Sequence, residues 1–81
     1  MEAIARTPQQ LGQTLRSRRA KLHLSQTDVG SKVGIKQDTV SMLEIRTSSS
    51  TVETLFKALS ALGLELVLRE RASTATSAQE W

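Results

Sequence analysis

The sequence predicts a small all-α domain of four to five helices, followed by one short strand. Apolar residues recur at helical spacing through the first 62 residues, and the spacing changes to every second residue over 64–71. The 81 residues suffice for one domain with a modest core. We therefore assign residues 1–71 to the domain and its strand, and residues 72–81, which are mostly small and polar, to a flexible tail.

A first helix is predicted over residues 8–22. Thr7 is a suitable N-cap, and Pro8 fits the first helical turn. Arg18 lies on the buried side, so its aliphatic stem can cover apolar surface while the guanidinium reaches water. The leucines that give this helix its apolar stripe are Leu11, Leu15 and Leu22.

The stretch "SQTDVGSKVGIKQDTVSMLE" predicts two short helices joined by a tight turn. Ser25 caps the first of them, which ends at Gly34, where a left-handed residue is favoured. The second runs from about residue 36 to 45, and Gly30 lets the two approach closely. This pattern is typical of a helix-turn-helix, which places its second helix on the surface as a reading element. The residues expected to face the core are Val29, Val33, Val40 and Leu43, and those expected to face outward are Gln37, Asp38, Ser41 and Met42.

A fourth helix follows the loop "RTSSS" and ends at Gly63. The letters "STVE" form a capping box, with Ser50 as the N-cap and Glu53 reaching back; Thr51 is the alternative cap. Its amphipathic pattern consists of Val52, Leu55, Phe56, Leu59 and Leu62.

The segment "LELVLRER", residues 64–71, has the alternation of a strand. A single strand leaves its backbone groups unpaired, and the same strand of a second copy could pair with it across a two-fold axis. We therefore infer a homodimer in which Leu64, Leu66 and Leu68 mediate dimerisation. The alternative, an extension of the fourth helix, has the wrong period.

Composition narrows the function. The net charge is +3, with +4 in the first fifty residues, which is consistent either with a surface that faces a polyanion or with a solvated helix face. Phe56 and Trp81 are the two aromatic residues, too few for binding through base stacking. There is no cysteine, and His23 has no clustered carboxylates, so we expect no metal, no cofactor and no enzymatic activity. Without a membrane-length apolar run or a signal-peptide core, a cytoplasmic protein is expected.

Two stretches, "LGQTLRSRRAKLHLSQTDVGSKVGIKQDTVSMLE" and "TVETLFKALSALGLEL", resemble the Cro/C1-type (XRE) helix-turn-helix family over residues 11–64. The resemblance implies a lambda-repressor-like fold. Within that family the chain is most similar to HipB-type antitoxins, on the basis of "VGIKQDTVS", the strand after the fourth helix, and the closing "EW". It departs from the family at four positions. Arg18 stands where an apolar residue is common, His23 and Arg46 where glycine is, and Ser50 where proline is.

A protein that recognises a sequence in double-stranded DNA needs hydrogen-bond donors and acceptors near the N-terminus of its recognition helix. The candidate base-reading residues are Lys36, Gln37, Asp38 and Ser41, and the candidate phosphate-binding residues are Ser25, Gln26, Arg46, Thr47 and Ser48. Asp38 either accepts from cytosine or stabilises the helix N-terminus, and Met42 either touches a thymine methyl or is exposed filler. Arg19 could bind phosphate, but the resemblance implies a structural ion pair with Glu44.

These expectations combine into one function. The chain is predicted to be a homodimeric transcriptional repressor that binds a palindromic operator in double-stranded DNA and regulates its own operon. The resemblance adds a HipA-type serine/threonine kinase toxin as partner, with Trp81 as an anchor in it; the alternative for Trp81 is a frayed terminus. The other functions considered are a stand-alone XRE-family or phage-type regulator without a toxin, and a pure protein-interaction module.

Overall fold

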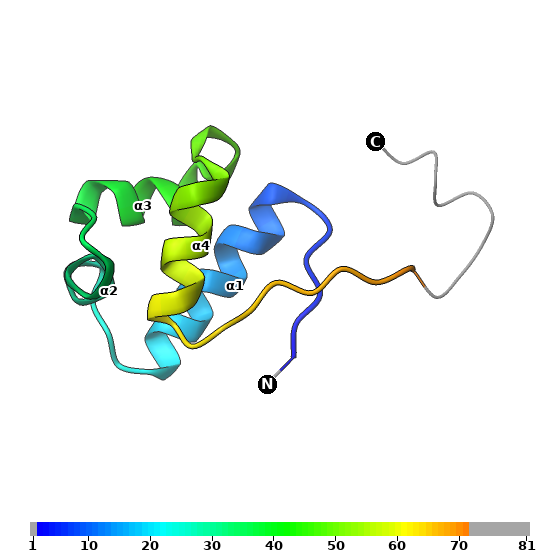
Figure 1. The fold of residues 1–81 in the computed structure, drawn as a ribbon, viewed down its shortest axis with the longest axis horizontal. Coiled ribbons are helices and arrows are strands. Elements are labelled where there is room, and N and C mark those ends of the chain that lie inside the picture. Colours follow the sequence, from blue (N-terminus) through cyan, green and yellow to red (C-terminus); the bar gives the residue numbers. More distant parts are fainter. Residues whose placement is uncertain (1, 72–81) are drawn as a thin grey trace.

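A computed structural model describes residues 2–71 (Figure 1). The predicted tail, with Trp81, lies outside the described residues. The elements are α1 (Pro8–Lys21), α2 (Gln26–Val33), α3 (Gln37–Ile45), the short 3₁₀ helix η1 (Thr47–Ser49) and α4 (Val52–Ala61). The all-α class and the four helices are confirmed. None of the described helices is long and apolar enough to cross a membrane.

Three helices begin at a side-chain cap. The hydroxyl oxygens of Thr7, Ser25 and Thr51 each accept a hydrogen bond from the backbone N–H three residues later, at 3.0–3.1 Å. The expectation that Ser50 caps α4 is wrong, and the alternative cap Thr51 is the one used. Ser50 belongs to the preceding turn, because its own N–H donates to the Thr47 carbonyl oxygen at 3.0 Å.

Three helices also end in a left-handed residue. The φ angles are +73° at Gly34, +68° at Gly63 and +58° at His23. Glycine adopts this conformation at no steric cost, whereas histidine does so at some cost. Backbone hydrogen bonds hold His23 in place: its N–H donates to the Ala20 carbonyl oxygen, and the next N–H, of Leu24, donates to that of Arg19.

The core lies where α3 packs against α1 and α2, and where α4 covers α2. Two glycines permit this packing. A Cβ at Gly30 would collide with the carbonyl oxygen of Ile35, and a Cβ at Gly12 would collide with Thr47 and the backbone of Glu44. The close approach predicted at Gly30 is therefore confirmed, to the turn before α3. The fully buried apolar residues are Leu15, Val29, Val40, Leu43, Ala58, Leu59 and Leu62.

The apolar stripe of α4 is wider than the domain can cover. Leu59 and Leu62 are buried, but Val52 is 68% exposed and Phe56 is 50% exposed. These two side chains continue the stripe past the side that packs on the other helices. Two large apolar groups therefore remain largely exposed on the surface formed by residues 2–71.

Arg18 makes a contact beyond its expected role. In addition to covering apolar surface, its Nε donates to the carbonyl oxygen of Leu62 at 3.0 Å, so the guanidinium binds the end of α4. A cation there satisfies one of the carbonyl groups left unpaired at a helix C-terminus. The contact ties α1 to the point from which residues 64–71 depart.

Residues 64–71 extend away from the helices and form neither helix nor strand in the single chain (Figure 1). The alternative of a longer fourth helix is excluded, because α4 ends at Ala61. Leu64 packs against the core of its own chain, whereas Leu66 and Leu68 are exposed. Arg69 lies 3.7 Å from Glu2, which brings the N-terminal segment beside this one. Pairing with a second copy remains a prediction.

Candidate nucleic-acid interface

The outward face of α3 carries the side chains expected to read DNA. Gln37 and Asp38, in its first turn, are exposed, and Ser41, one turn later, is half-buried. Lys36 is the N-cap residue, and its exposed side chain forms no capping hydrogen bond. The structure thus brings all four candidate base-reading residues to one end of one helix.

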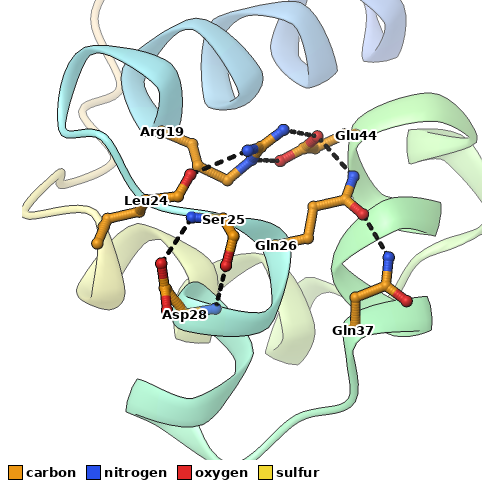
Figure 2. A network of polar contacts seen from close by, with 7 residues as sticks. All are labelled: Arg19, Leu24, Ser25, Gln26, Asp28, Gln37 and Glu44. Atoms are coloured by element: carbon orange, nitrogen blue, oxygen red, sulfur yellow. Dashed lines mark hydrogen bonds and ion pairs between the residues drawn. The ribbon is translucent and has the colours of Figure 1, made fainter.

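An internal ion pair joins the inner side of α3 to α1 (Figure 2). Arg19 donates from Nε to one carboxylate oxygen of Glu44 at 2.6 Å, and from its terminal amine to the other at 3.0 Å. Arg19 also donates to the Leu24 carbonyl oxygen at 3.0 Å. The hydrogen bond to Glu44 raises the pKa of Arg19, so this guanidinium stays charged. Arg19 is therefore used inside the protein and is not available to a phosphate.

Gln26 connects the ion pair to the reading surface. Its side-chain nitrogen donates to Glu44 at 3.1 Å, and its side-chain oxygen accepts from Gln37 at 2.5 Å. A carboxylate can only accept, so Glu44 fixes which way the Gln26 amide points, and Gln26 in turn fixes Gln37. Figure 2 shows Gln26 lying between the other two side chains. Sequence reasoning missed this series of hydrogen bonds, because the bonded residues are 18 and 11 positions apart in the sequence.

The hydrogen bond to Gln26 determines which donors and acceptors Gln37 has left for a base. One of its two N–H donors is used on Gln26, which leaves one N–H donor and the carbonyl oxygen. One donor beside one acceptor is the set that binds adenine at N7 and N6 in the major groove. The chemistry of the site therefore matches adenine.

The start of α2 is less open to phosphate than the sequence suggests. Ser25 and Asp28 bond reciprocally: the Ser25 N–H donates to the Asp28 carboxylate at 2.8 Å, and the Asp28 N–H donates to the Ser25 hydroxyl oxygen at 3.0 Å. The bond from the Ser25 N–H, and then that involving its hydroxyl, lower the pKa of Asp28. A negative charge thus stands at this helix end, and both the N–H and the hydroxyl of Ser25 are engaged with Asp28.

The loop after α3 places two of its three phosphate candidates on the surface. Arg46 and Ser48 are exposed. Thr47 is half-buried, and its hydroxyl donates to the Leu43 carbonyl oxygen at 2.7 Å. The Thr47 side chain therefore closes the end of α3 and has no hydrogen left to donate to a phosphate.

Within residues 2–71, no group of three or more histidine, cysteine or acidic side chains is placed to hold a metal ion.

The helix-turn-helix family model matches residues 15–68, which is most of the chain. The chain belongs to the Cro/C1-type (XRE) helix-turn-helix family. Its fold is that of a DNA-binding transcriptional regulator and not that of an enzyme. No curated protein sequence is a significant match to this XRE-family chain.

Solved structures similar to this XRE-family chain contain HipB. One, a single-substitution variant of HipB in an "O2 20mer complex", is 30% identical with a TM-score of 0.82, and the match covers 86% of this chain and 97% of that one. Two others, a "HipA-HipB-O2-O3 complex" and a "HipB-O4 20mer complex", are each 31% identical with a TM-score of 0.79 and the same coverage. The predicted similarity to HipB-type antitoxins is confirmed.

Proposed function

We propose that this chain is a homodimeric repressor that binds a palindromic operator in double-stranded DNA and regulates its own operon. We further propose that it is the antitoxin of a cytoplasmic toxin–antitoxin pair, whose toxin is a HipA-type serine/threonine kinase. In this proposal, residues 1–71 bind DNA and dimerise, and residues 72–81 bind the partner.

One observation carries the DNA-binding proposal. The chain of hydrogen bonds from Arg19 through Glu44 and Gln26 to Gln37 holds an exposed amide in a fixed orientation. Holding a reading side chain in place before binding reduces the entropy lost on binding. A buried network that ends in an exposed amide is hard to explain as support for the fold alone. It supports Gln37 as the residue that reads adenine.

The remaining contacts follow from position. Lys36 donates to guanine or to phosphate, and Ser41 can bond to several base edges. Asp38 accepts from cytosine N4 or stabilises the N-terminus of α3. Phosphate contacts come from the exposed Arg46 and Ser48, and from the hydroxyl of Ser25. Gln26 acts chiefly through Gln37, since both ends of its amide are already bonded.

The dimer places two such surfaces on one duplex. Leu66 and Leu68 are exposed on a segment that pairs with no strand among residues 2–71. Pairing with the same segment of a second copy would satisfy its backbone groups and cover these leucines. Val52 and Phe56 on α4 are further exposed apolar side chains that a second copy would cover. The two recognition helices would then enter successive major grooves roughly 34 Å apart.

The antitoxin proposal is supported by the similar structures. Two of them are complexes of HipB with a 20mer, and a third also contains HipA. We propose that Trp81 anchors the tail in a pocket of the kinase, since tryptophan is frequent among residues that dominate binding energy. A stand-alone regulator is the second candidate, because the family match ends at residue 68 and so does not include the tail.

Fluorescence anisotropy tests the DNA-binding proposal. The protein is titrated into a duplex from just upstream of its own gene, and into a scrambled duplex, at several salt concentrations. We expect tight, selective binding that weakens steeply as salt rises, because phosphate contacts release counterions. Equal, weak binding to both duplexes would contradict an autorepressor.

A kinase assay tests the antitoxin proposal. The chain and its Trp81→Ala variant are each mixed with the HipA-type kinase encoded beside the gene, and complex formation and autophosphorylation are measured. We expect a stable complex with the wild type and at least tenfold weaker binding by the variant, with unchanged DNA binding. No complex with either chain would favour the stand-alone regulator.

A further inference from the structure

Two large apolar side chains on α3 are not explained by the fold. Met42 is 44% exposed and Ile45 is 69% exposed, although Val40 and Leu43 on the same helix are fully buried. Neither side chain belongs to the buried core or packs against it. Both lie on the outward side of the helix, together with the polar residues proposed to read DNA.

Met42 and Ile45 sit in a shallow hollow on this face. Its lining consists of Asp38, Ser41, Met42, Ile45 and Arg46. The lining surface is mostly apolar. Lys36 before α3 and Arg46 after it put a positive charge at each end of the face, which suits a polyanion.

The chemistry of the major groove identifies the group that fits there. Base edges in that groove present hydrogen-bond donors and acceptors, and their one apolar group is the thymine C5-methyl. Met42 follows Gln37 by five residues, which is about 7.5 Å along the helix axis. That separation allows Met42 to reach a different base pair from the one that Gln37 contacts.

We propose that Met42 is a specificity-determining residue that packs its thioether on the C5-methyl group of a thymine, in a different base pair from the adenine read by Gln37. Ile45 forms the far wall of the same contact. This inference rests on the proposed function, because it assigns a second base to the same recognition helix. It accounts for an exposed thioether that neither the core nor the hydrogen-bond network uses.

Replacement of thymine by uracil tests the proposal, because it removes the methyl group and leaves base pairing intact. The upstream duplex is prepared with each symmetric pair of thymines replaced in turn. Each duplex is titrated with wild type, Met42→Ala and Leu22→Ala, the last being a similarly exposed side chain, at 38%, at the end of α1. Thermal melts check that all three chains fold.

We expect one pair of replacements to weaken wild-type binding by about fourfold per half-site, as for removing one buried methyl-sized group. Leu22→Ala should show the same loss, and Met42→Ala should bind the two duplexes equally. The wild type could select the upstream duplex and yet lose no more affinity than Met42→Ala on any thymine replacement. In that case the assignment of Met42 is wrong, although the DNA-binding proposal stands. If the wild type does not distinguish the upstream from the scrambled duplex, both fail.

Discussion

Two exposed surfaces of this domain differ in how their side chains are held. On the outer face of α3, Gln37 is fixed by a chain of hydrogen bonds that begins at a buried ion pair. On the outer face of α4 and along residues 64–71, apolar side chains such as Phe56 and Leu68 stand exposed and are held by nothing described in their own chain.

The difference indicates what each surface meets. Polar groups that must recognise a base pattern are oriented in advance by the interior, because a misplaced donor loses its hydrogen bond. Apolar groups gain from being covered by any complementary surface, and orientation matters less. The first surface therefore suits DNA, and the second suits another copy of the chain.

The largest effect is expected from separating the two copies. Leu66→Asp combined with Leu68→Asp places charges where the second copy would pack. We expect a monomer by sedimentation and a loss of DNA affinity of about 10²–10⁴-fold, because binding at two linked half-sites is lost. Glu65→Gln, on the alternate side of the segment, is the control. A double variant that remains dimeric would show that the second surface has been assigned wrongly.

Breaking the ion pair is expected to cost the most stability. Arg19→Met leaves the Glu44 side chain, which is 4% exposed, charged and unpaired. We expect unfolding free energy to fall by about 3–5 kcal/mol in urea titrations. Replacing both residues by methionine should recover most of this loss, since no charge is then stranded. If the double variant is as unstable as the single one, the loss comes from packing and not from an unpaired charge.

Removing the reading amide should affect DNA binding alone. Gln37→Ala is expected to weaken operator binding by about 1–3 kcal/mol per half-site, with an unchanged melting temperature. Gln13→Ala removes an exposed glutamine from α1 and serves as the matched control in anisotropy titrations. An equal loss in both variants would point to a general polar effect, and no loss in Gln37→Ala would favour a protein-interaction module.

Substitutions at two left-handed helix ends should change the free energy of unfolding by smaller amounts and in opposite directions. Gly34→Ala is expected to destabilise by about 1 kcal/mol, because a Cβ there meets no neighbour and only the backbone conformation resists it. His23→Gly should stabilise by about 0.5 kcal/mol, since the saved strain exceeds the added chain entropy. Urea unfolding measures both. Stabilisation by Gly34→Ala would contradict the backbone argument.

The smallest effect concerns Asp28 and depends on pH. Its pKa is lowered from 3.8 by the bond from the Ser25 N–H, so the contribution is fully present well above pH 3.8 and is lost as the pH falls through the lowered value. Asp28→Ala should therefore lower the urea midpoint at pH 7 and make little difference at a pH below the lowered pKa. A difference of the same size at both pH values would exclude the charged capping bond as its source.

The sequence predicts local features of this fold well, because neighbouring residues determine them. The left-handed end at Gly34 and the cap at Ser25 depend on residues within one turn, and both were expected. The core positions Val29, Val40 and Leu43 were also expected, whereas Val33, expected in the core, is half-buried and lies outside it. The α4 cap could not be decided between Ser50 and Thr51, because the choice depends on where η1 ends.

Features that depend on distant residues were not predictable. Arg18 contacts Leu62 across 44 positions, and nothing near Arg18 in the sequence indicates a carbonyl there. The link between Gln26 and Gln37 depends on how α2 and α3 cross. The exposure of Phe56 depends on how much of α4 the other helices cover. In each case the local pattern gave the residue type, and the packing determined its partner.

A two-dimensional ¹⁵N–¹H NMR titration of the uniformly labelled chain tests the assignment of two surfaces most directly. At a concentration where the dimer is complete, the upstream duplex is added; separately, the free chain is diluted. The account predicts that DNA shifts the amide signals of residues 36–48 most, and that dilution shifts those of residues 64–71 and of α4. Strong shifts of residues 64–71 on adding DNA, with α3 unmoved, would contradict it.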